Sequence, residues 1–358
     1  MSFFTDLAHQ YIDGEWRPGK GSWDIIDFNP FNGEKLASIP VATAEEVDRA
    51  YRAAERAQQA WADTNPYARR TVLEKALRIV EEREPEIAEA IVAELGGTHL
   101  KAGFELHLAK EFLREAIQLA LRPAGQILPS PTEGKENRVY RVPVGVVGVI
   151  SPFNFPFLLS LKSVAPALAL GNAVVLKPHQ NTPICGGTLL AKVFEDAGLP
   201  AGLLNVVVTD IAEIGDTLLE HPVPQVISFT GSDKVGRHVA TVCAANLKRA
   251  ILELGGNSAL IVLDDADVEY AVDAAVFSRY VHQGQVCMAA NRILVDRAVE
   301  AEFTEKFVAK VASLTVGDPA DPATQIGPLI NSSQADPKIP HGDPSSAPVV
   351  GVDIRNGL

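Results

Sequence analysis

From residue 144 onward, short apolar runs alternate with longer segments whose apolar residues recur at helical spacing. The short runs predict strands, and the segments between them predict helices. Strands that are apolar on both faces and alternate with helices are typical of a parallel sheet covered by helices on both sides, the doubly wound α/β class. The strands are expected at 144–150, 173–177, 204–208, 226–229 and 250–253, with helices that include 157–170, 183–197 and 233–245.

Short strands followed by helices are expected in the first 121 residues. Apolar segments separated by turn residues suit small surface strands within 11–40. Thr43 and Glu46 stand three positions apart, as in a capping box, and open a helix to about residue 61. Further helices are expected at 68–83, 85–95 and 100–121.

Residues 123–143 change character, because prolines and glycines interrupt short strand-like runs. An extended hairpin or an ordinary surface hairpin fits this composition. A second α/β unit is then expected in the last part of the chain. It consists of strand 257–263, helix 267–278, strand 291–296 and helix 298–313.

The composition is that of a globular protein large enough for two domains, with 358 residues, 47% hydrophobic and 22% charged. Its net charge of −13 argues against nucleic acid or an anionic membrane as a partner, because both would repel it. Solubility alone also accounts for this acidity. The most apolar stretch, 153–176, is interrupted by prolines, a glycine and a lysine, so no membrane span is predicted.

Three widely spaced cysteines, Cys185, Cys243 and Cys287, indicate neither a disulfide framework nor a zinc cluster, and no metal site is expected. The first residues lack a basic segment followed by an apolar run, so no secretory signal is visible. Together these features predict a reducing compartment, the cytoplasm. Cys185 and Cys243 are expected to pack inside helices.

Cys287 is the thiol with the surroundings of a reactive group, because it follows Gly284 and lies among polar residues. A thiolate is a strong nucleophile near neutral pH. Glu253 stands 34 positions earlier (287 − 253) and precedes Gly255-Gly256, which let the backbone approach a ligand closely. A nucleophile and a carboxylate base are two parts of an acyl-transfer site. For a cysteine considered alone, a small buried packing residue is the alternative.

Further polar motifs follow the predicted strands, at whose carboxyl ends ligands bind in parallel sheets. Asn154 follows the first of these strands, and Lys177 ends the second. Gly231 precedes a predicted helix, whose free N–H groups suit a phosphate. The alternatives without a binding function are that Asn154 is a turn residue and that Lys177 is a solvated lysine at the end of a strand.

Cys287 and Glu253, with their spacing and these motifs, resemble the aldehyde dehydrogenase superfamily, from about residue 11 to residue 334. The resemblance implies NAD(P)-dependent oxidation of an aldehyde to a carboxylic acid through a cysteine thiohemiacetal and a thioester. Cys287 would attack the carbonyl carbon. Asn154 would hold the oxyanion together with the Cys287 N–H, and Glu253 would activate the water that hydrolyses the thioester.

The resemblance also implies which residues contact the cofactor. Lys177 would bond the adenosine ribose. Gln180 stands where NAD-strict members carry Glu, so NADP is expected to be tolerated beside NAD. Phe153 replaces the Trp that is more frequent in the family. The full set expected to bind the cofactor is Ser151, Phe153, Lys177, Gln180, Phe229, Gly231, Ser232, Gly236 and Leu254.

In terms of domains, the resemblance implies a dinucleotide-binding domain of residues 1–122 and 144–252, and an oligomerisation arm, 123–143. Residues 253–334 would be the first part of a second, catalytic domain. The tail 335–358 shows no helical or strand periodicity and is expected to be unrelated to the family and disordered. It suggests a truncated chain that could be inactive. Complete members continue with a Glu-x-Phe-Gly-Pro motif, and a homo-oligomer is expected of the intact family.

The segment 282–288 looks most like the benzaldehyde and vanillin dehydrogenase branch, so an aromatic aldehyde is the expected small-molecule substrate. Two rival functions stay open. One is a non-catalytic fragment that binds a dinucleotide. The other is a thiol esterase or acyl transferase that uses Cys287 and Glu253 without a cofactor; Lys177 and Gly231-Ser232 count against it.

Overall fold

The computed structural model describes residues 3–334, and the predicted tail lies outside the described residues. Its main sheet has seven strands in the order β11-β10-β7-β8-β9-β1-β2, of which the first five are parallel. The doubly wound prediction is confirmed, because the strand order reverses between β7 and β10. The parallel strands are β7 (Val146–Ile150), β8 (Ala173–Lys177), β9 (Leu204–Val206), β10 (Pro224–Thr230) and β11 (Arg249–Glu253).

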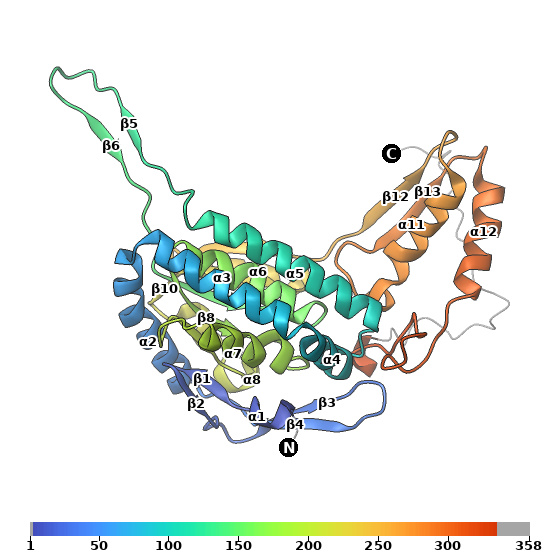
Figure 1. The fold of residues 1–358 in the computed structure, drawn as a ribbon, viewed down its shortest axis with the longest axis horizontal. Helices are drawn as coiled ribbons and strands as arrows, with labels where there is room; N and C mark the ends of the chain where they lie inside the picture. Colours follow the sequence, from blue (N-terminus) through green and yellow to red (C-terminus); the bar gives the residue numbers. More distant parts are fainter. Residues whose placement is uncertain (1–2, 335–358) are drawn as a thin grey trace.

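Two groups of helices cover this sheet (Figure 1). α6 and α7 contact the parallel strands and carry α3 and α5 on their outer side, next to α4. The second group packs against the sheet through α2, with α9 and α10 beside it. The bounds are α2 (Ala44–Asp63), α3 (Pro66–Glu82), α4 (Glu84–Leu95), α5 (His99–Leu119), α6 (Pro156–Ala169), α7 (Leu189–Asp196), α9 (Thr217–Glu220) and α10 (Asp233–Ala245).

The prediction of surface strands near the N-terminus was wrong for the first of them. β1 (Gln10–Ile12) is buried along its whole length and extends the main sheet antiparallel to β9, with β2 (Glu15–Arg17) at the edge. The side chain of Gln10 makes this possible. Its amide donates to the carbonyl oxygens of Pro40 (2.8 Å) and Val208 (3.0 Å) and accepts from the Val208 N–H (2.6 Å). A polar residue is thereby buried without loss of hydrogen bonds.

The capping box at the start of α2 is confirmed, and the helix predicted at 183–197 is irregular. Thr43 accepts from the Glu46 N–H, and the Glu46 carboxylate accepts from the Thr43 N–H. The first turn of the later helix is a π-helix, η1 (Ile184–Thr188), followed by α7. The buried Glu94 carboxylate accepts from the Ile184 and Cys185 N–H groups, at 2.7 Å each.

Two further antiparallel hairpins lie outside the main sheet. β3 (Asp24–Phe28) pairs with β4 (Lys35–Pro40) near the N-terminus. β5 (Gln126–Leu128) pairs with β6 (Asn137–Val139), and this hairpin projects far from the body of the molecule (Figure 1). Its role as an oligomerisation arm stays a prediction.

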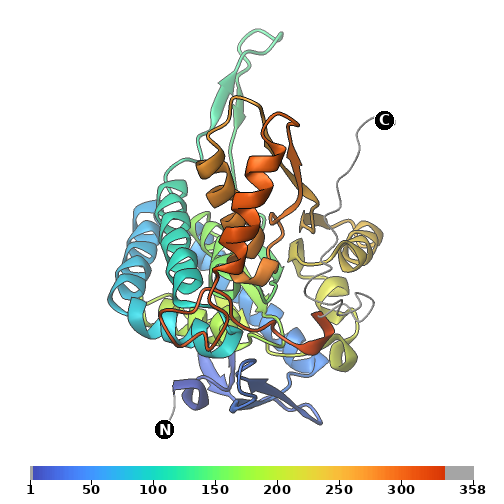
Figure 2. The same cartoon turned by 90° about the vertical axis from the view of Figure 1, so that its right-hand side faces the viewer.

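A smaller unit follows β11 (Figure 2). β12 (Ser258–Val262) and β13 (Ala290–Val295) pair in parallel, with α11 (Val268–Tyr280) and α12 (Glu300–Ala312) packed together beside them. This unit has its own apolar cluster, which includes Val262, Val272 and Phe303. Within residues 3–334, no helix is long and apolar enough to cross a membrane.

Candidate active site

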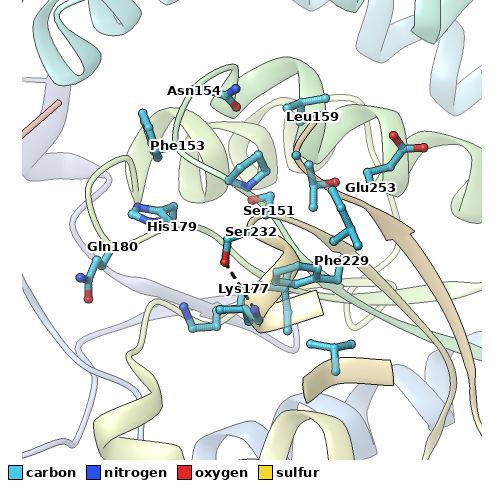
Figure 3. A pocket seen from close by; sticks show the side chains of 18 of the residues that line it. Ser151, Phe153, Asn154, Leu159, Lys177, His179, Gln180, Phe229, Ser232 and Glu253 are labelled. Carbon is cyan, nitrogen blue, oxygen red and sulfur yellow. Dashed lines mark hydrogen bonds between the residues drawn. The ribbon is translucent and has the colours of Figure 1, made fainter. Parts of the chain in front are cut away.

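A cavity of about 730 Å³ lies at the carboxyl ends of β7, β8, β10 and β11 (Figure 3), and the segment that carries Cys287 also lines it. The strand order reverses at this place, which is where ligands bind in doubly wound sheets. Every predicted site residue lines the cavity except Gly236. Those that do are Ser151, Phe153, Asn154, Lys177, Gln180, Phe229, Gly231, Ser232, Glu253, Leu254 and Cys287.

The segment before Cys287 has an unusual backbone. His282, Gln283 and Gly284 have positive φ angles of 51°, 56° and 73° in succession, within the short helix η2 (Val281–Gly284). Only glycine adopts this region without strain, so the two side-chain-bearing residues are held there by their surroundings. His282 is buried, and its carbonyl oxygen accepts from the Gln285 N–H (3.0 Å). The tight turn leaves Cys287 exposed.

Asn154 connects the end of β7 to this turn. Its side-chain nitrogen Nδ2 donates to the carbonyl oxygen of Gln285 (2.9 Å), and its oxygen Oδ1 accepts from the Phe155 N–H (3.0 Å). An amide nitrogen carries two hydrogens, so the bond to Gln285 leaves one N–H to donate elsewhere. Asn154 is therefore oriented by the segment that carries the thiol.

Glu253 is the last residue of β11 and lies beside Thr230 in the sheet register. Its carbonyl oxygen accepts from the Gly231 N–H (3.0 Å), and its carboxylate oxygen Oε1 lies 3.8 Å from Nζ of Lys162. Three residues later, a Cβ at Gly256 would stand 3.0 Å from the carbonyl oxygen of Cys287. The loop after Glu253 therefore lies directly against the thiol segment.

Lys177 and Gln180 occupy the other end of the cavity, with His179 and Phe153 (Figure 3). Burial lowers the pKa of Lys177, whose Nζ donates to the carbonyl oxygen of Pro178 at 3.4 Å. Burial, and then the charge of Lys177, lower the pKa of His179 to about 4, so this imidazole is neutral at pH 7. The His179 ring meets Phe153 edge-on, with centroids 5.4 Å apart.

Gly231 and Ser232 form the turn between β10 and α10. A Cβ at Gly231 would lie 2.5 Å from the Phe229 ring, so a larger residue does not fit there. Ser232 caps α10 and accepts from the Val235 N–H (3.4 Å). Gly236 lies outside the cavity lining, unlike the other predicted residues, because it is buried under Leu254; a Cβ there would lie 2.4 Å from Leu254 Cδ2.

Asp210, Asp216 and His238 are among the polar side chains that line the cavity although sequence reasoning did not single them out. Asp210 caps the short helix α8 (Ile211–Ile214) through its bond to the Ala212 N–H (2.8 Å). His238 Nε2 lies 2.8 Å from a carboxylate oxygen of Asp216. Asp210 and Asp216 lie in loops, and His238 lies on α10, and none of them belongs to a recognisable motif. Their place at this site could have been predicted only from the order of the strands in the sheet.

The comparison with known proteins agrees with this arrangement. The family model described as "Aldehyde dehydrogenase family" matches residues 16–338. The chain belongs to the aldehyde dehydrogenase family. It is therefore a member of a family of enzymes that oxidise aldehydes, as the sequence motifs predicted. In the described residues, no group of three or more His, Cys, Asp or Glu side chains could hold a metal ion.

Individual relatives are similar over nearly the whole chain. Benzaldehyde dehydrogenase YfmT of Bacillus subtilis (strain 168) is 59% identical over 336 residues, which are 94% of this chain and 69% of that protein. Vanillin dehydrogenase of Corynebacterium glutamicum is 46% identical over 331 residues, 92% of this chain and 68% of that protein. The crystal structure of a NAD-dependent benzaldehyde dehydrogenase from Corynebacterium glutamicum superimposes with a TM-score of 0.89 at 45% identity, covering 93% and 73% of the two chains.

Proposed function

We propose that the cavity oxidises an aldehyde to a carboxylic acid, with Cys287 as nucleophile, Glu253 as base and Asn154 as oxyanion donor. The observation that supports this assignment is the convergence of three distant chain segments. Asn154 donates to Gln285, two positions before Cys287, and Gly256 of the Glu253 loop meets the Cys287 carbonyl. All three side chains line one cavity.

NAD fits the remainder of the cavity, with NADP tolerated. The N-terminus of α10 follows Gly231 and lies beside the cavity, and its N–H groups and helix dipole would favour the negative charge of a phosphate. Lys177 would hold the adenosine ribose, and the neutral amide of Gln180 would not repel a 2′-phosphate. When bound, the nicotinamide supplies the acceptor for the hydride that the substrate carbon loses.

The exposed sulfur of Cys287 would add to the carbonyl carbon, which moves the C=O electron pair onto oxygen and gives a thiohemiacetal. The second N–H of Asn154 and the backbone N–H of Cys287 would then donate to this oxygen. A preorganised donor of this kind lowers the barrier by about 3 kcal/mol. Loss of hydride re-forms the C=O bond and leaves a thioester on Cys287.

Glu253 would complete the reaction by accepting a proton from water as the water oxygen attacks the thioester carbon. The C–S bond then breaks, the acid leaves and the Cys287 thiolate is restored. Its position at the cavity margin, with more than half of its side-chain surface exposed, gives the carboxylate access to water.

An aromatic aldehyde is the proposed substrate. The names of the benzaldehyde and vanillin dehydrogenases among the relatives support it. The cavity lining near Asn154 also includes the apolar side chains of Leu159 and Val286. A flat ring would bury its apolar faces against such side chains.

The replacement Cys287→Ala tests this proposal. It should abolish the formation of NADH from benzaldehyde while the affinity for NAD, followed by protein fluorescence, stays unchanged. Cys243→Ala is the matched control, because that thiol is buried and does not line the cavity. Turnover that survives in Cys287→Ala would refute the assignment, and hydrolysis of a nitrophenyl ester without any aldehyde oxidation would favour a cofactor-independent esterase.

A further inference from the structure

Glu253 makes an ion pair that the proposed mechanism does not use. Nζ of Lys162, on α6, lies 3.8 Å from the Glu253 carboxylate oxygen Oε1. The same Nζ lies 5.7 Å from the centroid of the Phe112 ring on α5, within the range of a cation–π contact. The ammonium is therefore held between the aromatic ring and the proposed base.

The backbone that carries Lys162 is firmly placed. Leu159, three residues earlier on α6, lines the cavity, so Lys162 projects from the same helix face. The first turn of α6 is fixed by Glu105, whose carboxylate accepts from the Leu158 N–H (3.0 Å). Glu105 itself is fully buried and pairs with the buried Lys101.

The backbone of Glu253 is equally fixed, but its side chain is not. Pairing with β10 and the bond from the Gly231 N–H hold the main chain. The side chain is 59% exposed, and that of Lys162 is 37% exposed. Exposed ion pairs of this kind contribute little to folding stability. The contact with Lys162 can therefore decide the orientation of the Glu253 carboxylate.

We infer that Lys162 is the positioning residue of Glu253. Its charge holds Oε1, and this leaves Oε2 to accept the proton of the water that attacks the thioester. The inference rests on the proposed function and deepens it. Only the second half of the reaction should depend on Lys162, because Asn154 is oriented by Gln285 and the thiol by its own turn. Misplacement of a reacting group by a small distance slows a step severalfold or more.

The experiment compares the lifetime of the acyl-enzyme in Lys162→Met, Lys162→Arg and the unchanged chain. The chain is acylated with a nitrophenyl ester, quenched at intervals and weighed intact by mass spectrometry. Lys162→Met should keep the rate of acylation and lengthen the lifetime of the adduct by roughly tenfold. Lys162→Arg should restore the lifetime, since it keeps the charge. Lys192→Met is the control, because Lys192 pairs with Glu195 and Asp196 on α7.

The outcomes separate this inference from the function on which it rests. The positioning role is supported if the adduct lives longer in Lys162→Met than in the unchanged chain, Lys162→Arg and Lys192→Met. Cys287→Ala should form no adduct, which shows that the acyl group is on Cys287. Equal lifetimes in Lys162→Met and the unchanged chain overturn that role and leave the thiol mechanism standing. An unchanged chain that forms no adduct contradicts the thiol mechanism and the positioning role together.

Discussion

Two buried carboxyl groups face each other at a distance from the cavity. Asp27 on β3 is 1% exposed, and Glu94 on α4 is fully buried. Burial, and then the neighbouring Glu94 charge, raise the pKa of Asp27 to about 10, and burial also raises the pKa of Glu94. Because Glu94 accepts from two backbone N–H groups of η1, Asp27 is the partner that keeps the proton.

This pair predicts that folding stability falls as the pH rises. A group whose folded pKa is raised binds more protons in the folded than in the unfolded chain, between its ordinary value near 4 and about 10. Its contribution is therefore present at low pH and is lost through that window. Asp27→Asn should flatten the dependence of the unfolding free energy on pH and be more stable than the unchanged chain by about 1–3 kcal/mol near pH 9.

Chemical denaturation at a series of pH values measures this effect. Asp24→Asn is the control, because Asp24 lies on the same strand but is exposed. If Asp27→Asn and Asp24→Asn show the same slope with pH, Asp27 does not carry a bound proton in the folded protein.

At the scale of elements, the start of α2 depends on one carboxylate. Glu46 is buried and accepts from the Thr43 N–H and from the Lys20 N–H, at 3.0 Å each. It therefore completes the capping box and also fixes the chain before β3. Glu46→Ala should lower the unfolding free energy by about 1–3 kcal/mol, because two N–H donors lose a charged acceptor. Urea denaturation provides the measurement.

Glu45 offers a matched control for this helix. It lies one position earlier in the same first turn and is exposed. Its negative charge interacts favourably with the helix N-terminus, as that of Glu46 does, but it lacks the hydrogen bonds of Glu46. Glu45→Ala should cost at most a few tenths of a kcal/mol. Equal losses in the two variants would mean that the helix dipole, rather than the hydrogen bonds of Glu46, stabilises this end of α2.

The same elements show how far local pattern determines structure. Continuous apolar runs identified the parallel strands, because burial on both faces leaves no polar position in them. The capping box was readable since both partners lie within four residues. By contrast, the burial of Gln10 depends on carbonyls at Pro40 and Val208, far away in sequence. The π-turn of η1 depends in the same way on Glu94.

At the candidate site, the sequence predicted a residue's position only where that residue belongs to a motif at the end of a strand. Asn154, Lys177 and Glu253 each follow or end a parallel strand, so the fold class alone predicted their convergence. The left-handed backbone of His282 and Gln283 was not predictable, because residues other than glycine adopt positive φ angles only rarely. Nor was the presence of Asp210, which reaches the cavity only through the position of β9 in the sheet.

At the scale of the whole molecule, the cavity is lined by elements that are far apart in the chain. A dinucleotide bound there contacts several of them at once and should raise the free energy of unfolding of the whole protein. NAD at about 100 times its dissociation constant should add about 2.7 kcal/mol to the unfolding free energy. Thermal denaturation with increasing NAD measures the shift. Lys177→Met should weaken it, whereas Lys192→Met on α7, away from the cavity lining, should not.

NADP should raise the melting temperature as well, because the exposed amide of Gln180 carries no charge to repel the 2′-phosphate. A carboxylate at that position would repel it, so Gln180→Glu should reduce the shift with NADP and keep the shift with NAD. If NADP fails to stabilise the unchanged chain, an acidic group at a position other than 180 excludes the phosphate. Asp210, which lines the same end of the cavity, is then the residue to replace with Asn, and recovery of the NADP shift would identify it.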